Sequence, residues 1–155
     1  MDIRMTEIRR TTGESMGISL KSLDKEAVAE VDWHRADLLG MQLNEFLFHG
    51  AAMRNAELRG ASGTNCSFSG ANCILASFRG AVFRDSSFAG AKLRHADFSG
   101  AILKNIDFVG ADLTEAKFNG ADVEGSNFVG VQATRTDFSG CNILETQKQT
   151  FSQDD

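Results

Sequence analysis

Glycine recurs at every tenth position from Gly40 to Gly140, and a matching five-residue unit lies halfway between successive glycines. Residues 36–145 therefore divide into 22 consecutive five-residue blocks without an insertion. The third residue of a block, called the centre below, is usually Phe or Leu, and the residue two positions earlier is usually Ala. Strict internal periodicity is typical of repeat architectures and constrains the fold more than any local motif does.

A period of five excludes the two common regular structures for this repeat. An α-helix turns about 100° per residue, so five residues advance the centre by about 140° and spread the apolar side chains around the helix. A straight strand alternates between its faces, so an odd period would place every second centre on the wrong face. A chain that turns a corner once per block keeps all centres inside. The repeat therefore predicts a coil of short straight faces around a narrow core, a β-solenoid.

The ten-residue spacing of glycine indicates an even number of faces per coil, and four is the smallest number that leaves an interior. Twenty residues then make one coil, and two opposed columns of Phe fill a square core together with two columns of smaller centres. Gly63 and Ala133 are undersized centres and are predicted weak points. The predicted Phe columns comprise Phe48, Phe68, Phe88, Phe108 and Phe128 on one face and Phe78, Phe98 and Phe118 on the opposite face.

Several blocks share the form Ala-Asp followed by a large apolar centre, among them Ala36-Asp37-Leu38 and Ala111-Asp112-Leu113. This pattern resembles the pentapeptide-repeat family over residues 31–145. The resemblance implies an all-β fold, a right-handed quadrilateral β-helix with four blocks per coil. It also implies a bacterial protein that is not an enzyme, because this describes most members of the family.

The N-terminal region is predicted to form two segments. Residues 1–17 carry no periodicity, so we expect a flexible segment. Residues 18–30 carry apolar side chains at helical spacing and predict a short helical cap over the first coil, with Trp33 below it. Leu23, Val28 and Trp33 are also five residues apart, so an upward extension of the repeat is the alternative.

The C-terminal end is predicted to be thinly covered. Residues 146–155 form a polar tail in which Phe151 is the only large apolar residue. The last coil, with Phe138, Cys141 and Ile143, would then leave an open sheet edge that favours end-to-end association of two copies. Some members of the resembled family dimerise through this end. A monomer closed by Phe151 is the alternative.

No group of residues in the sequence has the pattern of a catalytic, cofactor or metal site. Cys66, Cys73 and Cys141 fall at inward positions on different faces, where a cysteine serves as small apolar filler. The three histidines are far apart, and a metal site needs converging ligands. The Asp and Asn residues before the centres are expected to bond to the backbone at the corners. We therefore expect no enzymatic activity, no cofactor and no metal.

The cysteines and the N-terminus favour a cytoplasmic location. An odd number of widely spaced cysteines suits reduced thiols better than a disulfide framework. The first ten residues are charged and lack the apolar stretch of a signal peptide. No apolar run approaches the ~18 residues that a membrane span requires, so no membrane contact is expected.

Charge is unevenly distributed along the chain. Residues 46–105 hold seven basic and three acidic residues, whereas residues 106–155 hold three basic and nine acidic residues. The net charge of -5 argues against direct nucleic-acid binding. Such lengthwise asymmetry could orient a protein partner, and a chance distribution of surface charge is the alternative.

One outward column carries small apolar residues directly after the centres. We predict a candidate partner surface there, formed by Leu47, Ala89, Asp107, Val109 and Val129. The expected function is a non-enzymatic scaffold or adaptor that presents a rigid solenoid surface to a protein partner.

A DNA mimic is the alternative. Pentapeptide-repeat proteins of the quinolone-resistance type resemble duplex DNA in width and charge and bind type II topoisomerases such as gyrase. The acidic C-terminal half of this chain fits that role. The basic middle, with Arg59 and Arg79 on one predicted face, departs from it, because a DNA-binding saddle would repel such a surface.

Overall fold

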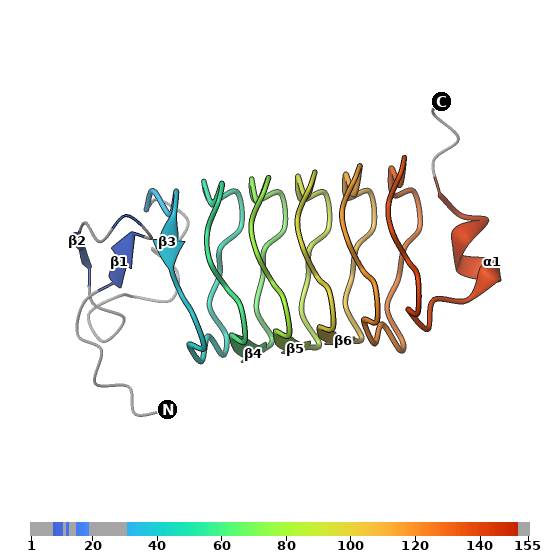
Figure 1. Ribbon diagram of the computed structural model, residues 1–155, viewed down its shortest axis with the longest axis horizontal. Coiled ribbons are helices and arrows are strands. Elements are labelled where there is room, and N and C mark those ends of the chain that lie inside the picture. The colour runs from blue at the N-terminus through green and yellow to red at the C-terminus, as the bar shows by residue number, and fades with distance from the viewer. Residues whose placement is uncertain (1–7, 11, 13–14, 19–30, 152–155) are drawn as a thin grey trace.

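The computed structural model describes residues 8–10, 12, 15–18 and 31–151. From residue 31 onward the chain winds into a straight stack of coils (Figure 1). Residues twenty apart lie side by side in parallel pairs, from Asp32 with Ala52 to Lys117 with Asp137. Each coil therefore contains four blocks, and the predicted quadrilateral β-helix is confirmed.

Most pairings between coils involve a single residue per face. Longer strands form on one face only among the described coils, where β4 (Ser62–Thr64), β5 (Val82–Arg84) and β6 (Ile102–Lys104) pair in parallel. These three strands follow one edge of the stack in Figure 1. The strands are short because each block has only three residues before its corner.

Each corner is made by a residue in the left-handed conformation. From Arg35 to Gly140, the fifth residue of every block has a φ between 50° and 72°. On two opposed faces this residue is glycine, which adopts positive φ without steric cost. Side-chain-bearing residues such as Asn55 and Leu75 take the same conformation on the other faces. The corner requirement explains why glycine recurs with the spacing that the sequence shows.

Backbone hydrogen bonds join each coil to the next. The amide of Phe98, for example, donates to the carbonyl of Lys117 at 2.7 Å, and the corner is closed by the amide of Ala101 donating to the Phe98 carbonyl at 3.0 Å. The residue before the centre accepts a second corner bond, as when the Asp107 carboxylate accepts from the Val109 amide at 2.9 Å. The expected backbone-bonding role of these Asp and Asn side chains is confirmed.

The core consists of two stacked columns of phenylalanine rings. Within a column the rings lie nearly parallel, with centroids 4.6 Å apart for Phe68 and Phe88 and 4.7 Å for Phe78 and Phe98. Rings of opposite columns meet edge to face, as Phe88 and Phe98 do at 5.7 Å and 87°. All eight predicted core phenylalanines are buried: Phe48, Phe68, Phe78, Phe88, Phe98, Phe108, Phe118 and Phe128.

The small centre Gly63 does not leave an empty space in the core. A Cβ atom at this position would lie 2.5 Å from Cys66 Sγ and 3.0 Å from Cε1 of Phe83. The cysteine therefore fills the space that Gly63 leaves, and its thiol donates to the carbonyl of Leu43 at 2.8 Å. Ala133, the other undersized centre, is only partly buried, in the last coil.

The N-terminal end carries a small antiparallel sheet that the sequence does not predict. β1 (Ile8–Arg10) pairs with β2 (Ser15–Ile18) and with β3 (Ala36–Asp37) of the first coil. The expected flexible segment 1–17 is thus corrected at these positions. The predicted helix over 18–30 lies outside the described residues, except for the end of β2.

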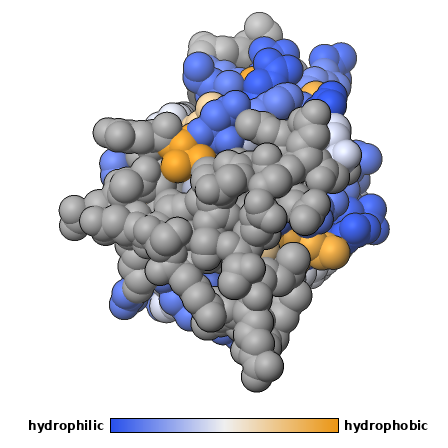
Figure 2. All heavy atoms as spheres, turned by 90° about the vertical axis from the view of Figure 1, so that its left-hand side faces the viewer, coloured by the Kyte–Doolittle hydropathy of each residue, from blue (hydrophilic) through white to orange (hydrophobic). Residues whose placement is uncertain are grey.

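Trp33 belongs to the repeat itself. Its side chain is buried and meets Phe48 edge to face at 5.3 Å, and its amide donates to the Ala52 carbonyl at 2.9 Å. Trp33 is therefore the centre of a block that precedes Ala36, and the proposed upward extension through Leu23 and Val28 lies outside the described residues. Seen from this end, the described side chains around the stack are mostly hydrophilic, with isolated apolar spots (Figure 2).

The C-terminal end is covered by α1 (Glu145–Lys148) and the residues after it (Figure 1). The amide of Gly130 donates to Thr150 at 2.9 Å, and the Gln147 side chain donates to the Ser126 carbonyl at 2.6 Å. The polar tail expected over 146–155 therefore contains part of a short helix. The sequence does not predict this helix, because four residues are too few to show a periodic pattern. None of the helices that the structure describes has the length and apolar character needed to cross a bilayer.

Candidate interaction surfaces

The predicted partner surface is partly assembled by the structure. The carbonyls of Ala89, Val109 and Val129 accept from amides of the preceding coils, which stacks these three residues one coil apart. Val109 is 37% exposed and Val129 is 50% exposed, and Asp107 lies beside them. Ala89, Asp107, Val109 and Val129 are called the valine ladder below.

Leu47 does not belong to the valine ladder. The bridges along its column run from Leu47 through Ser67 and Ser87 to Asp107, so Leu47 is three coils away from Asp107. The intervening coils present hydroxyl groups, with the Oγ atoms of Ser69 and Ser87 2.8 Å apart. The apolar surface is therefore limited to the C-terminal half of this face.

The predicted end-association residues gather at the last coil but are partly covered. The ring of Phe151 stacks on that of Phe138 with centroids 5.6 Å apart. Ile143 is buried, and Cys141 is half-buried, which raises the pKa of its thiol. Phe151 therefore covers the apolar surface of the last coil.

The last coil also leaves backbone donors open. Within the described chain, the amides of Ala133, Arg135, Phe138 and Gly140 have no hydrogen-bond acceptor. In preceding coils the equivalent amides donate to the next coil, as those of Leu113 and Phe118 do. Two faces at this end therefore retain an unpaired sheet edge.

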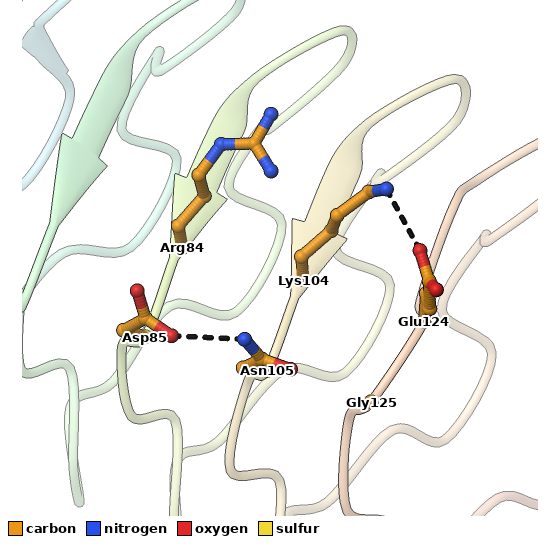
Figure 3. A pocket seen from close by; sticks show the side chains of 6 residues that line it. All are labelled: Arg84, Asp85, Lys104, Asn105, Glu124 and Gly125. Atoms are coloured by element: carbon orange, nitrogen blue, oxygen red, sulfur yellow. Dashed lines mark hydrogen bonds and ion pairs between the residues drawn. The ribbon is translucent and has the colours of Figure 1, made fainter.

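A further surface feature, which the sequence does not predict, is an open pocket of about 320 Å³ beside β5 and β6. Figure 3 shows its charged groups meeting across neighbouring coils. Lys104 Nζ lies 2.8 Å from Glu124 Oε2 and 3.4 Å from Asp122 Oδ2, which raises the pKa of Lys104. The residues lining the pocket are Arg84, Asp85, Lys104, Asn105, Glu124 and Gly125.

These pocket groups largely satisfy one another. Asn105 Nδ2 donates to Asp85 Oδ1 at 3.0 Å, and Asn105 occupies the space above Gly125. A ligand would have to displace the Lys104–Glu124 pair. The predicted coil length places Arg84, Lys104 and Glu124 in one column, but the sequence does not show that their side chains leave a hollow between them.

The seven basic residues of the middle region are distributed over three faces. Arg59 and Arg79 are stacked and lie within 4 Å of Glu57 and Asp97, respectively. Arg84 and Lys104 lie at the pocket, whereas Arg54, Lys92 and Arg94 share a third face. The charge asymmetry along the chain therefore also has a direction around the solenoid.

The cysteines are poor nucleophiles in this fold. Burial raises the pKa of the Cys73 thiol to about 12, so it stays protonated at neutral pH. Cys66 is also buried, and none of the three cysteines forms a disulfide in the described part of the chain. No cluster of three or more metal-ligating side chains occurs in the described part of the chain.

Comparison with known families identifies the class of protein. The family model for pentapeptide repeats matches eight copies, over residues 43–72, 66–105 and 106–143. These matches cover more than half of the chain, so the chain belongs to the pentapeptide-repeat family. Membership gives the β-helix its right-handed sense. No functionally curated protein matches the sequence.

Solved structures share the fold. A pentapeptide repeat protein from the Arabidopsis thaliana thylakoid lumen is 25% identical, with a TM-score of 0.61 over 72% of this chain and 74% of that one. HetL, involved in heterocyst differentiation regulation in the cyanobacterium Nostoc sp. strain PCC 7120, is 23% identical, with a TM-score of 0.58 over 68% of this chain and 58% of HetL. QnrB1, a plasmid-mediated fluoroquinolone resistance protein, is 18% identical, with a TM-score of 0.51 over 74% of this chain and 65% of QnrB1.

Proposed function

We propose that this protein is a non-enzymatic scaffold or adaptor that presents the valine ladder to a protein partner. The observation that carries the proposal is the exposure of Val109 and Val129 on adjacent coils of a hydrogen-bonded solenoid. A backbone fixed by inter-coil bonds loses little conformational entropy when it binds, so a small apolar ladder can contribute to affinity. Asp107 beside the ladder adds a charge that selects the partner's orientation.

The test is partner capture with matched variants. Wild-type protein, Val109→Glu/Val129→Glu and a control, Leu39→Glu/Leu144→Glu, are immobilised and exposed to lysate of the native organism. Leu39 and Leu144 are exposed apolar residues away from the ladder, so the control adds the same charge elsewhere. We expect one protein to be retained by the wild type and the control and lost by the valine variant. Equal retention by all three proteins would refute the ladder as the binding surface.

A second candidate function, a DNA mimic that binds a type II topoisomerase, has one specific observation in its favour. The C-terminal half carries acidic residues on all four faces of the solenoid, among them Asp107, Asp112, Asp122 and Asp137, and QnrB1 shares the fold. The basic residues of the middle region oppose it. A gyrase supercoiling assay decides, because a mimic inhibits supercoiling or counteracts quinolone inhibition. No effect at high protein concentration would end this candidate.

We also propose that the protein works in a reducing, cytoplasmic compartment. No disulfide joins the cysteines in the described part of the chain, which supports this location because oxidising compartments favour disulfides. Fractionation of cells that carry the epitope-tagged protein tests the proposal. Recovery in a membrane-enclosed or exported fraction would contradict it.

A further inference from the structure

One face of the β-helix gathers cations and aliphatic side chains on four successive coils. The residues are Arg35, Arg54, Ile74, Leu75, Lys92 and Arg94, and this group is called the cationic face. Amide-to-carbonyl bonds link Arg35 to Arg54 at 2.9 Å and Leu75 to Arg94 at 3.0 Å. Arg54 and Arg94 therefore lie two coils apart, with Ile74 between them.

The cations of this face lack counterions. Within the described chain, no ion pair involves Arg35, Arg54, Lys92 or Arg94. On other faces Arg59, Arg79 and Lys104 are paired, whereas Arg84 and Lys117 are not. Each of two other faces holds one such cation, so the gathering of four on this face is the first observation that points to a ligand.

Three carboxylates share this face, those of Asp32, Asp112 and Glu115. Asp112 lies one coil beyond Lys92 and accepts from the Thr114 amide at 3.0 Å, and Asp32 accepts from the His34 amide at 2.9 Å. Within the described chain, none of the three forms an ion pair with the four cations of the cationic face. Glu115 is one coil beyond His95 and is held by His95 and Arg135. Coils repeat at about 4.8 Å, so Arg54 and Arg94 have backbones about 10 Å apart, close to the screening length of physiological salt. An anionic chain laid along the face would relieve this repulsion.

Leu75 supplies a second, independent observation. It is 49% exposed and has a φ of 61°, and it is the one aliphatic residue among the described non-glycine residues with positive φ. Both features are unfavourable, because a left-handed conformation strains a leucine and exposure leaves its side chain in water. A strained and exposed residue beside unpaired cations is typical of a binding position.

We propose that the cationic face binds an acidic, extended protein segment that places carboxylates on Arg54, Lys92 and Arg94 and an aliphatic side chain on Leu75. A polypeptide is favoured over a nucleic acid because the face offers no aromatic ring for base stacking; the single aromatic residue of these blocks, Trp33, is buried. This site lies on a different face from the valine ladder, so the two proposals can fail separately.

The experiment measures fluorescence anisotropy with a dye-labelled synthetic peptide of alternating glutamate and leucine. We expect saturable binding to the wild type that weakens as salt is raised. Arg54→Glu/Arg94→Glu should reduce affinity at least about tenfold, since it reverses two charges at the contact. Leu75→Asn should reduce affinity about threefold through the lost apolar contact.

The matched control is Arg59→Glu/Arg79→Glu, which makes the same charge change on another face and should alter affinity less than about twofold. Arg54→Gln/Arg94→Gln replaces the charge-reversal variant if circular dichroism shows that the latter is unfolded. Val109→Glu/Val129→Glu should still bind the peptide, which separates this site from the valine ladder. Absence of saturable binding, equal losses in both arginine double variants, or tighter binding of a single-stranded oligonucleotide would overturn the proposal.

Discussion

At the scale of single residues, each block of this fold has two structural requirements. Its centre must fill a column of the core, and its fifth residue must adopt a positive φ at the corner. Glycine takes this corner conformation on two faces, and on the other two faces residues with side chains take it at every described corner except Gly125. An L-residue in the left-handed region carries a penalty of about 1–2 kcal/mol, which short polar residues such as Asn reduce. The side-chain-bearing corners therefore differ in stability according to residue type.

Leu75 and Asn55 allow a reciprocal test of this corner penalty, since they occupy the same column one coil apart and have φ values of 61° and 57°. We expect Leu75→Asn to raise the free energy of unfolding by about 1 kcal/mol, because asparagine tolerates this conformation. Asn55→Leu should lower it by a similar amount. Urea unfolding measures both changes. A decrease for Leu75→Asn would mean that the leucine packs favourably despite its φ.

Gly63 and Cys66 allow a test of how the undersized centre is filled. Gly63→Ala should destabilise the protein by about 1–3 kcal/mol, because the new methyl would overlap Cys66 Sγ. In Gly63→Ala/Cys66→Ala the sulfur is gone, so the double variant should be close to Cys66→Ala alone, with a coupling energy of about 1 kcal/mol or more. A double-mutant cycle in urea measures it. Additive effects would show that the two positions do not share space.

The filling of Gly63 also shows where sequence reasoning ends at this scale. The repeat predicts that Gly63 is a centre and that Cys66 points inward from the next block. It does not predict that the sulfur leans into the neighbouring column, since this depends on the corner geometry between the two blocks. The same holds for the αL strain at Leu75, which became visible only with the backbone angles.

At the scale of elements, the two phenylalanine columns are the main source of cohesion between coils. Each interior ring has a stacked neighbour above and below, as Phe98 has Phe78 and Phe118, both at 4.7 Å. A single coil could not offset the entropy of ordering its residues, so the columns stabilise the array only as continuous structures. A ring in the interior of a column should therefore contribute more to the free energy of unfolding than a ring at the end of a column.

Phe98→Ala should destabilise the protein by about 3–5 kcal/mol, because it removes a buried ring from the middle of a column. Phe138→Ala should lower the free energy of unfolding by only about 1–2 kcal/mol, since this ring is partly exposed at the last coil. Both values come from urea unfolding followed by circular dichroism. Equal effects, or a change at Phe98 no larger than a surface substitution gives, would contradict the column model.

The elements that the sequence did not predict are those outside the period. β1, β2 and α1 contain three or four residues each, too few for a hydrophobic pattern to emerge. The valine ladder was predicted because the coil length places Val109 above Val129, whereas Leu47 was wrongly grouped with it. Leu47 lies two coils before Ala89, and the coil between them presents Ser67 and Ser69 in place of apolar side chains.

At the scale of the whole molecule, the two ends of the solenoid differ in how their sheet edges and apolar surfaces are covered. The first coil is continued by the antiparallel pairing of β1 with β3, which occupies one of its sheet edges. The last coil keeps open amides at Arg135, Phe138 and Gly140 in the described structure, and its apolar surface is covered by Phe151. We expect the lid to be the main barrier to association with a second copy, because unpaired sheet edges otherwise template association.

Phe151→Ser should therefore promote self-association, because it uncovers the ring of Phe138 beside the open amides. Sedimentation velocity over a range of concentrations measures it, and we expect the variant to dimerise at lower concentration than the wild type. Leu144→Ser is the control, since Leu144 is 63% exposed and its loss removes apolar surface without uncovering the core. If Phe151→Ser and Leu144→Ser behave alike, the ring does not act as a lid. If Phe151→Ser instead dissociates a wild-type dimer, Phe151 is itself part of an end-to-end interface.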